Sequence, residues 1–566
     1  MNHNQRDYNY YEEHAADVRL GEITSCERNI RILRWLRGGN DEEFNKFPRI
    51  HLDLGITVSD FFSNLALNKC NDLGWLGYFI GRSRQLKDLS IFFDTTLQGD
   101  PGLSLPQVDA LVQGISLNRS ITRLGIHGEL GDILLQRLDQ FLRGNMKLAH
   151  LHVLGFDIGL ASALKLALVL RDMSLKSFQV ERLCYDFDAE VFIDDGAVAA
   201  EVITSLSKHT KLKSLELVQC NLDRRGCMAL GKLPSLKELR LQSNGIDDEG
   251  MKALACGLSV SVRSLPSSRS GLAVLHSLKE LSLTKSIAGD DALHCLVAAL
   301  ANNTAVELLD LSRNTSITAK GLSSLSSLLQ SERCCLKDLR LRYMRIGDDG
   351  AAALADALAG NKSVKRLEFE DWVLALEPIE VEIGSIGWSA FARLLCDTSS
   401  VNNTYLSNHT LKKCKCNDNP LFNRTSVIVP PDVEYYLALN RDLEQASMYK
   451  ILSEHPEFDM KPLLQQWQLK FLPLMVAWFE AARARQHLMR RDVFTSIDVL
   501  QRRELSAIYQ FMRGLPSLAV EGCLDQQMAG SQSKKRKQTM IDSFVNEVDR
   551  PLRRRNVARE MNEEAE

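Results

Sequence analysis

Residues 336–358 read LKDLRLRYMRIGDDGAAALADAL, and this stretch decides the fold of the chain. Its first six residues follow the spacing L-x-x-L-x-L, in which apolar and polar residues alternate as they do in a half-buried β-strand. Residues 347–350, Gly-Asp-Asp-Gly, then supply a polar turn and a helix start. Leu354 and Leu358 are four residues apart and therefore lie on one face of a helix. The stretch predicts a strand, a turn and a helix in one short unit.

The same unit recurs along most of the chain. Its copies begin at Leu86, Ile121, Leu148, Leu175, Leu212, Leu236, Leu278, Val306, Leu336 and Val364, with weaker candidates at Phe47 and Val401. The helical leucine pair recurs at a constant offset, as Leu254 with Leu258, Leu296 with Leu300, and Leu325 with Leu329. The best-spaced copies are 27 to 30 residues apart, which is long enough for a strand and a helix. The chain is therefore predicted to be a repeat array.

Each position that recurs among the units has a physical role. The leucines of the strand and of the helix close one core from opposite sides, so that no unit is stable without its neighbours. Asn244 and Asn314 occupy the ninth position of their units, where an amide side chain satisfies backbone groups that stacking would bury. Several N-x-S/T triplets, such as the one at Asn361, fall where a helix leads into the next strand. They are predicted to cap the backbone there rather than to carry glycans.

These residues resemble the ribonuclease-inhibitor-like subfamily of leucine-rich-repeat proteins, above all in residues 346–358. The resemblance covers roughly residues 47–411. It implies an α/β solenoid shaped like a horseshoe, in which a parallel sheet lines the concave side and helices cover the convex side. In that family the concave face usually holds a protein partner. This chain departs from the pattern by long gaps between some copies, such as Leu236 to Leu278, which predict insertions on the rim.

Four regions are predicted. Residues 1–46 form a polar tail and an N-terminal capping helix, and residues 47–429 form the solenoid of about 10–12 irregular repeats. Residues 430–528 form helices with closely spaced aromatic residues, which we interpret as a C-terminal cap, with a separate binding module as the alternative. Residues 529–566 are a charged, basic tail whose composition predicts disorder.

The composition excludes several functional classes. The chain has 566 residues, and its formal net charge of −3 argues against nucleic acid as a partner. No apolar run approaches the roughly 18 residues of a membrane span, and the first residues carry no apolar signal segment. Thirteen cysteines without a C-x-x-C motif predict free thiols in a reducing compartment. We therefore expect an intracellular protein, cytoplasmic or nuclear, without membrane contact.

No catalytic or metal-binding motif is present in the sequence. It contains no phosphate loop, no dinucleotide fingerprint, no H-E-x-x-H and no G-x-S-x-G. His409, Cys414 and Cys416 have the wrong spacing for a metal site and predict a loop, whereas His150 and His152 lie on one strand without an acid or nucleophile placed beside them. The sequence predicts no enzyme activity, no cofactor, no metal and no small-molecule substrate.

The predicted function is a scaffold that binds a protein partner of unknown identity on its concave face. In a strand written x-x-L-x-L-x-x, the residues around the two leucines face that side. The predicted partner-binding residues are Glu238, Arg240, Gln242, Asp310, Asp338, Arg340, Arg342, Tyr343, Arg366, Glu368 and Glu370. Their alternating charges suit a polar protein surface, and Arg340, Arg342 and Tyr343 are the expected anchors, because Arg and Tyr dominate interface energetics.

Two other functions remain open. Activators of the Ran-type GTPase share the repeat subfamily, but their repeats are usually followed by an acidic segment, where this chain has aromatic helices. The second alternative is a nuclear adaptor that acts through its tail. There Lys534, Lys535, Arg536 and Lys537 form a candidate import signal, and Gln538, Ile541 and Phe544 match the first three fixed places of the sliding-clamp-binding box. Val545 stands where that box usually has an aromatic residue.

Overall fold

The structure is a computed structural model, and its described residues form two compact units. The described residues are 6–53, 66–67, 73–93, 105–128, 142, 147–154, 160–182, 185–186, 191–192, 196–233, 235–258, 275, 277–301, 303–370, 383–416, 429–442 and 446–455. The larger unit contains those up to residue 397 together with those from 406 to 446. The smaller unit contains residues 398–405 and those after 446.

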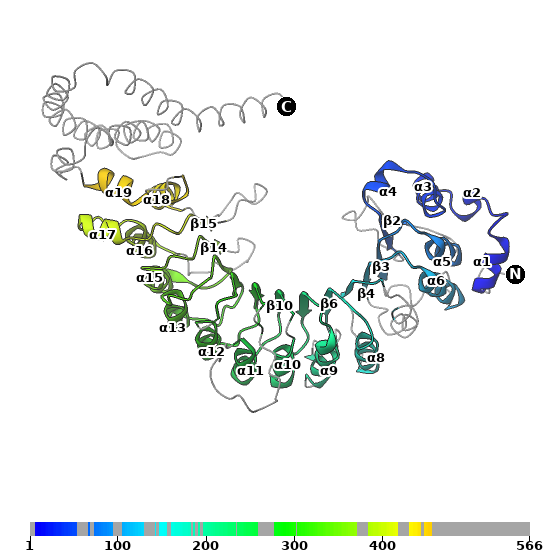
Figure 1. Ribbon diagram of the computed structural model, residues 1–566, viewed down its shortest axis with the longest axis horizontal. Coiled ribbons are helices and arrows are strands. Elements are labelled where there is room, and N and C mark those ends of the chain that lie inside the picture. The colour runs from blue at the N-terminus through cyan, green and yellow to red at the C-terminus, as the bar shows by residue number, and fades with distance from the viewer. Residues whose placement is uncertain are drawn as a thin grey trace, which may run out of the picture. The chain divides into compact units, whose positions relative to one another are not determined.

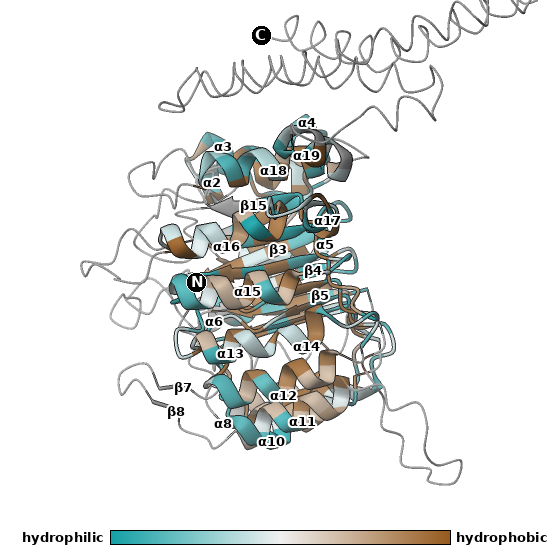
Figure 2. Cartoon of the chain, turned by 90° about the vertical axis from the view of Figure 1, so that its left-hand side faces the viewer, coloured by the Kyte–Doolittle hydropathy of each residue, from teal (hydrophilic) through white to brown (hydrophobic). Residues whose placement is uncertain are grey.

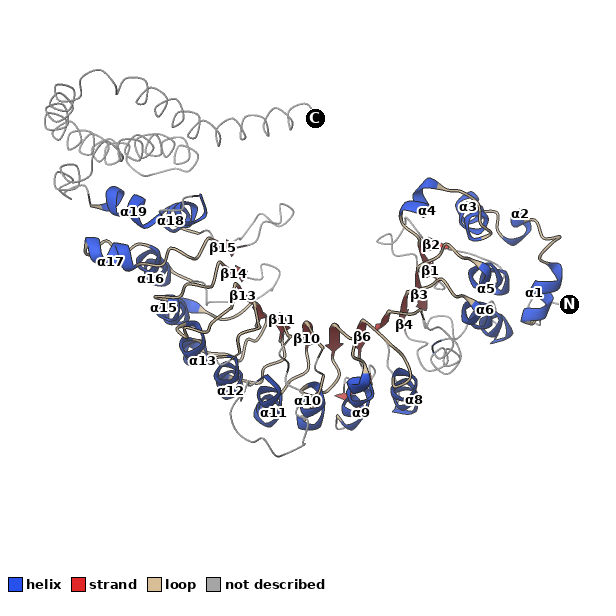
Figure 3. Ribbon diagram, viewed as in Figure 1, coloured by secondary structure: helices blue, strands red, loops and turns tan. Residues whose placement is uncertain are grey.

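A single sheet of parallel strands runs through the larger unit. Its strands are β1 (Arg49–Asp53), β2 (Ala66–Leu67), β3 (Asp88–Phe93), β4 (Arg123–Gly128), β5 (His150–Leu154), β6 (Ser177–Glu181), β9 (Ser214–Val218), β10 (Glu238–Gln242), β11 (Glu280–Ser282), β12 (Leu308–Asp310), β13 (Asp338–Arg342), β14 (Arg366–Glu370) and β15 (Lys413–Cys416). Twelve of these thirteen strands follow chain order across the sheet, and β2 lies at the edge beyond β1 (Figure 3). A short antiparallel pair, β7 (Tyr185–Asp186) with β8 (Val191–Phe192), lies outside this sheet.

The strands confirm the repeat positions that the sequence predicts. Every strand from β3 to β14 in the main sheet begins two residues after a predicted repeat start, as β13 begins at Asp338 after Leu336. The weaker candidate at Phe47 also precedes a strand, β1. The weaker candidate at Val401 is wrong, because a helix begins there. The strand of that repeat is β15, whose repeat starts at Leu411.

Two cysteines at leucine positions explain why the sequence does not predict this last repeat. Leu411, Cys414 and Cys416 keep the L-x-x-L-x-L spacing, with cysteine at the second and third leucine positions. The prediction of a loop for Cys414 and Cys416 is therefore wrong, because both belong to β15. Cysteine behaves as a small apolar side chain and substitutes for leucine on the core side of a strand.

Helices lie along one side of the row of strands, as Figure 1 shows for α8 to α16. The helices of the chain are α1 (Tyr8–His14), α2 (Leu20–Ile23), α3 (Glu27–Leu36), α4 (Glu42–Lys46), α5 (Leu73–Arg82), α6 (Leu105–Leu117), α8 (Leu160–Leu170), α9 (Ala197–Ser205), α10 (Arg224–Leu230), α11 (Asp248–Leu258), α12 (Asp290–Leu300), α13 (Ala319–Ser324), α14 (Ser326–Leu329), α15 (Gly347–Leu358), α16 (Ser385–Leu395), α17 (Val401–Leu406), α18 (Pro431–Asp442) and α19 (Ala446–Glu454). Hydrophilic and hydrophobic residues interleave along α10 to α13 (Figure 2), which is typical of helices with one buried and one exposed face.

The core lies between the strands and the helices of each repeat. Leu239 and Leu241 of β10 and Leu254 and Leu258 of α11 are all fully buried. The predicted helical pairs therefore close the core that the strand leucines open, as the repeat pattern requires. This arrangement leaves the other side of the sheet free for residues that do not build the core.

Asparagine side chains join neighbouring repeats at the end of the strands. The amide Nδ2 of Asn244 donates to the backbone oxygen of Leu217 at 2.9 Å, and its Oδ1 accepts from the backbone N–H of Cys220 at 2.8 Å. Asn314 repeats this pattern with the oxygen of Leu283 and the N–H of Ser286. The predicted role of the ninth position is thus confirmed.

A second set of asparagines bonds the turns that lead from helices into strands. The Nδ2 of Asn361 donates to the oxygen of Leu329 at 2.6 Å, and its Oδ1 accepts from the N–H of Val364 at 2.8 Å. Asn118, Asn303 and Asn408 make equivalent bonds. Asn118, Asn361 and Asn408 are the first residues of N-x-S/T triplets, and all three are almost fully buried. Their amides bond the backbone as the sequence predicts, so these three triplets are structural.

Helices also lie at both ends of the described chain. At the N-terminal end, the longest helix of residues 1–46 is α3, whose N-cap residue is Cys26. Towards the C-terminus, Asn440 of α18 donates to the backbone oxygens of Asn408 and Leu411, which extends the second set of asparagines past the last strand. In the smaller unit, Thr404 and His455 form a buried hydrogen bond of 2.8 Å. The bounds predicted for the four regions stay a prediction.

Candidate protein-interaction surface

The side of the sheet opposite the helices carries the residues that the sequence predicts for partner binding. We call this side the strand face. In β10, Leu239 and Leu241 point into the core and are buried, whereas Glu238 and Arg240 are half-buried and Gln242 is exposed. The other predicted residues belong to three strands, with Asp310 in β12, Asp338, Arg340 and Arg342 in β13, and Arg366, Glu368 and Glu370 in β14. Tyr343 follows β13 directly.

The sheet register places these residues in rows across neighbouring strands. Arg340 lies opposite Asp310 on one side and opposite Glu368 on the other. Arg240 of β10 lies opposite Glu216 of β9. Opposite charges on directly paired strand positions attract, so the alternation of sign along this row stabilises the sheet.

Five of these side chains form one group of ion pairs, which we call the arginine cluster: Asp338, Arg340, Arg342, Arg366 and Glu368. The guanidinium of Arg342 lies 2.7 Å from the Glu368 carboxylate, and that of Arg366 lies 2.9 Å from Asp338. Arg340 lies between the two acids, 3.3 Å from Asp338 and 3.5 Å from Glu368. The three arginines thus share two carboxylates.

Burial differs between the acids and the arginines of the cluster. The side chains of Asp338 and Glu368 are only 12% and 11% exposed, whereas those of the three arginines are between 27% and 46% exposed. The acids therefore lie beneath the guanidinium groups and hold them in place. Because the geometry of an arginine is fixed before a partner arrives, less side-chain entropy is lost on binding. The cluster thus presents three partly ordered guanidinium groups at the surface.

A smaller group of ion pairs lies around Arg240. Its guanidinium is 3.2 Å from the carboxylate of Glu280 in β11 and 3.5 Å from that of Glu238 in the same strand. Glu238 also accepts a hydrogen bond from Ser214 of β9 at 3.2 Å. Here two acids surround one arginine, whereas in the arginine cluster three arginines share two acids.

Apart from Tyr343, the sequence analysis did not predict a role for a row of residues at the end of the strands. Arg182, Gln219, Ser243, Lys285, Arg313 and Tyr343 all have positive φ, between 51° and 63°. In this row the backbone N–H of Arg313 donates to the oxygen of Arg342 at 2.8 Å, so Arg313 and Tyr343 belong to adjacent repeats. The Arg313 guanidinium lies 4.9 Å from the centroid of the Tyr343 ring, within the range of a cation–π contact. The signal was a fixed offset, because each residue directly precedes the ninth position of its repeat.

The strand face has a different composition at β1 to β5. His127 of β4 stacks on Phe92 of β3 with a centroid distance of 4.3 Å. Burial, followed by the neighbouring imidazoles of His152 and His51, lowers the pKa of His127 to about 4. Burial also lowers the pKa of His152, and the nearby Arg123 lowers it further. These histidines are neutral near pH 7, so with Phe92 they form an uncharged patch beside the ion pair of Arg123 with Asp88, whose charged groups lie 3.5 Å apart.

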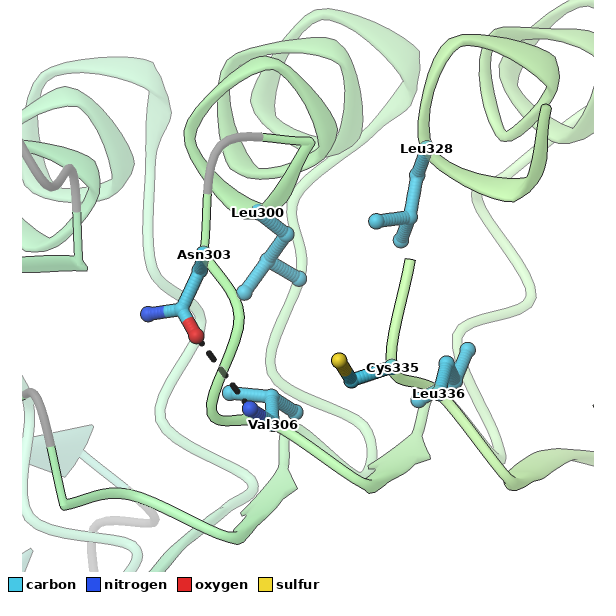
Figure 4. A pocket seen from close by; sticks show the side chains of 6 residues that line it. All are labelled: Leu300, Asn303, Val306, Leu328, Cys335 and Leu336. Atoms are coloured by element: carbon cyan, nitrogen blue, oxygen red, sulfur yellow. Dashed lines mark hydrogen bonds between the residues drawn. The ribbon is translucent and has the colours of Figure 1, made fainter. Parts of the chain in front are cut away.

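Neither a metal site nor a ligand cavity is evident in the part of the chain that the structure describes. No group of three or more His, Cys, Asp or Glu residues among the described ranges is placed to hold a metal ion. A small cavity of about 10 Å³ lies between two repeats and is lined by Leu300, Asn303, Val306, Leu328, Cys335 and Leu336 (Figure 4). Its volume is that of one water molecule at most, and most of its lining is core leucine and valine. This cavity belongs to the repeat packing.

One further observation concerns membranes. Among the helices of the described residues, none is long and apolar enough to cross a bilayer.

Comparison with known proteins identifies the repeats. The family model described as Leucine Rich repeat matches residues 208–231, 232–255, 302–326 and 333–355. Ribonuclease inhibitor of Mus musculus is 30% identical over 186 residues, which are 29% of this chain and 40% of that protein. NACHT, LRR and PYD domains-containing protein 13 of Homo sapiens is 29% identical over 427 residues, 62% of this chain and 40% of that protein. The chain thus spans about 40% of the length of these relatives.

A solved structure titled "Crystal structure of Rad7 and Elc1 complex in yeast" aligns with 66% of this chain and 90% of the other chain, at 14% identity and a TM-score of 0.32. The fold and the matched repeats define the class of this protein: its chain contains leucine-rich repeats that build a solenoid. In sequence these repeats are similar to those of ribonuclease inhibitor, in line with the resemblance described above.

Proposed function

We propose that this chain is a non-enzymatic scaffold that binds a protein partner on its strand face, with the arginine cluster and Tyr343 as the main contact. Leucine-rich-repeat proteins of this type generally bind other proteins, which supports the class of function. The observation that carries the position is the arginine cluster itself. Three partly exposed arginines are ordered there by two nearly buried acids.

The chemistry of the cluster favours a protein over a small ligand. Its charged groups extend from β13 to β14, and Tyr343 adds an aromatic ring with a polar end at the border of the same surface. Arg and Tyr side chains are enriched among the residues that contribute most to protein interfaces. A partner that presents carboxylates and backbone carbonyls would accept hydrogen bonds from guanidinium N–H groups that the two acids leave unused.

Crosslinking and capture from a cell extract test this proposal with two matched variants. The first is Arg340→Ala with Arg342→Ala on the strand face. The second is Arg224→Ala with Arg225→Ala, two exposed arginines of α10 on the helix side. The parent chain and the helix-side variant should capture the same partner, and the strand-face variant should lose roughly 1–4 kcal/mol of binding free energy.

Stability must be measured alongside binding, because this variant removes both arginines that pair with Glu368. A third variant, Arg342→Gln with Glu368→Gln, replaces both members of an ion pair and keeps polar side chains of similar size. Loss of the partner in this variant, with unchanged hydrogen exchange in β13 and β14, supports direct contact. Capture that survives in both strand-face variants and disappears in the helix-side variant would show that the partner binds elsewhere.

The two alternative functions remain weaker. The comparisons favour neither the GTPase regulator nor the nuclear adaptor. The candidate import signal (Lys534, Lys535, Arg536 and Lys537) and the candidate clamp box (Gln538, Ile541 and Phe544) lie outside the described residues. A synthetic peptide of residues 533–551, titrated against a sliding clamp, tests the adaptor hypothesis independently of the solenoid.

A further inference from the structure

A row of lysines follows one edge of the sheet. The residue that directly precedes a strand is lysine in eight of the eleven strands from β3 to β15 of the main sheet. These residues are Lys87, Lys176, Lys213, Lys237, Lys279, Lys337, Lys365 and Lys412, and all eight are exposed. We call them the lysine row. It lies at the beginning of the strands, whereas the residues proposed above lie along the strand face and at its far end.

Backbone hydrogen bonds place the row in register. The N–H of Lys213 donates to the oxygen of Lys176 at 2.8 Å, and Lys237 and Lys279 continue the same ladder at 2.8 Å each. The ladder proceeds through Glu307 to the last lysines of the row. Neighbouring strands are about 4.8 Å apart. The ladder from Lys176 to Lys412, which includes Glu307 and leaves out Lys87, therefore spans roughly 34 Å.

Most of these lysines have no acidic partner. Lys176, Lys213, Lys237, Lys365 and Lys412 form no ion pair with any residue that the structure describes. Glu307, which precedes β12, interrupts the row with an acid. Its carboxylate lies 2.7 Å from the ammonium group of Lys279 and 2.6 Å from that of Lys337. Hydrogen bonds from these two ammonium groups lower the pKa of Glu307 to about 2. Glu307 is therefore an example, within this chain, of a carboxylate bound by two lysines of the row.

A purely structural role accounts for only part of the charge. In each repeat the helix ends near this edge, and a helix C-terminus carries about half of a negative charge. The opposite edge holds the helix starts, where acids such as Asp290, Asp291, Asp348 and Asp349 complement the positive end. The positive charge of one lysine per repeat therefore exceeds the negative charge of the helix end by about half a charge. The net charge of −3 conceals a basic edge and an acidic edge.

The geometry distinguishes among anionic partners. The row is one residue wide, and the next position on the strand face includes the acids Glu238 and Glu280, which would repel a broad phosphate surface such as a duplex. Single-stranded nucleic acid usually stacks on aromatic side chains, and the helix-to-strand segments 207–213, 231–237, 301–307, 330–337 and 359–365 contain no Phe, Tyr or Trp. An extended acidic peptide needs neither a broad surface nor aromatic rings.

We propose that the lysine row is a second docking surface, which binds an extended run of about ten acidic residues of a partner protein along the edge of the sheet. A span of roughly 34 Å corresponds to about ten residues of extended chain. The carboxylates would pair with lysine ammonium groups as Glu307 does with Lys279 and Lys337. Exposed pairs of this kind contribute little one by one, so binding would depend on several of them and would weaken with salt.

The test uses the full chain and a fluorescent peptide of twelve glutamates, with binding measured by anisotropy at low and at physiological ionic strength. The row variant carries Lys176→Gln, Lys213→Gln and Lys237→Gln. The control variant carries Lys165→Gln, Lys252→Gln and Lys320→Gln, three exposed lysines on α8, α11 and α13. The row variant should bind about tenfold more weakly than the parent chain, and the control variant should differ by less than about twofold.

A gain-of-function variant adds a second readout. Glu307→Lys replaces the acid that interrupts the row with a ninth lysine and should strengthen peptide binding about threefold. Equal losses in the row and control variants, absence of peptide binding by the parent chain at low salt, or weaker binding by Glu307→Lys would each overturn the proposal. Tighter binding of a twelve-nucleotide single strand or duplex than of the peptide would overturn the choice of partner. Melting curves of all variants separate these results from loss of fold.

Discussion

The strand face differs in its chemistry between β1–β5 and β10–β14, although one backbone pattern builds both regions. In the first region Phe92 and His127 stack, and His127 and His152 are neutral near pH 7, beside one ion pair, Arg123 with Asp88. In the second region Asp338 and Glu368 form a cluster of ion pairs with three arginines. In both regions the leucine positions between these residues are filled by buried apolar side chains.

The difference shows which residues specify the fold and which are available for function. The buried positions repeat because every unit must close the same core. The positions between them are excluded from that core, so their chemistry can change from one repeat to the next without a change of fold. One solenoid can therefore present unlike surfaces to unlike partners or to different parts of one partner.

The largest expected effect tests the shared part of the comparison. Leu241→Ala in β10 and Leu124→Ala in β4 each remove a fully buried side chain. Each should cost roughly 2–5 kcal/mol of local stability, because a cavity opens in a packed repeat. Hydrogen exchange should show the loss in the mutated repeat and its neighbours. Uniform destabilisation from β3 to β15 would contradict the solenoid picture of locally coupled repeats.

The next effect is confined to the charged region. Arg340→Ala with Arg342→Ala removes both arginines that pair with Glu368, whose side chain is 11% exposed. The free energy of unfolding near β13 and β14 should fall by roughly 1–3 kcal/mol, because a nearly buried carboxylate loses its hydrogen-bond donors. Amide exchange in these strands measures the loss. Unchanged exchange there would mean that the acids are solvated well enough to need no partner.

The pH dependence of stability tests the region with the neutral histidines rather than the charged region. The folded pKa of His127 is about 4, below the value of about 6.5 in an unfolded chain, so the unfolded state binds more protons between these values. The stabilising contribution is complete above pH 6.5 and is lost as the pH falls towards 4. After allowance for partial exposure, His127 accounts for roughly 1–2 kcal/mol.

Replacement of His127 by Gln should flatten this pH dependence around β4. The matched control is His294→Gln, which changes an exposed histidine of α12. Hydrogen exchange at pH 7 and pH 5 provides the measurement. Equal pH sensitivity in the parent chain and in His127→Gln would remove the neutral histidines from the account of this region.

The smallest expected effect lies at the border of the charged region. Arg313→Ala removes the guanidinium that lies over the ring of Tyr343. The stability of the adjoining turn should change by about 0.5–1 kcal/mol, as expected for an exposed cation–π contact. The fluorescence and local exchange of Tyr343 report on this change. A larger loss would show that Arg313 also supports the fold of its own repeat.

The sequence predicts the repeat frame well, because that frame depends on local periodicity. The spacing of Leu236, Leu239 and Leu241 predicts β10, and the pair Leu254 and Leu258 predicts α11. The roles of Asn244 and Asn314 also follow from the sequence, since a polar residue at a fixed place among buried ones needs backbone partners. The failure at Val401 has a local cause, because Cys414 and Cys416 replace the expected leucines.

Contacts between repeats are harder to predict. The pairing of Arg342 with Glu368 joins residues 26 positions apart and depends on the register of two strands. The depth at which Asp338 and Glu368 are buried follows from the same packing, and the leucine spacing does not encode it. The lysine row was visible in the sequence, but only a comparison of the position before each strand across all repeats reveals it. Insertions of unequal length between repeats obscure that comparison.

The residues with positive φ at the ends of the strands have a consequence for engineering. Six non-glycine residues, Arg182, Gln219, Ser243, Lys285, Arg313 and Tyr343, accept a backbone conformation that most side chains avoid. The first five of these residues donate their backbone N–H to an oxygen of the next repeat, so the same hydrogen bonds hold the backbone at these sites. A side chain grafted from one repeat to another should keep its orientation, so this row offers a ready template for designing binding specificity one repeat at a time.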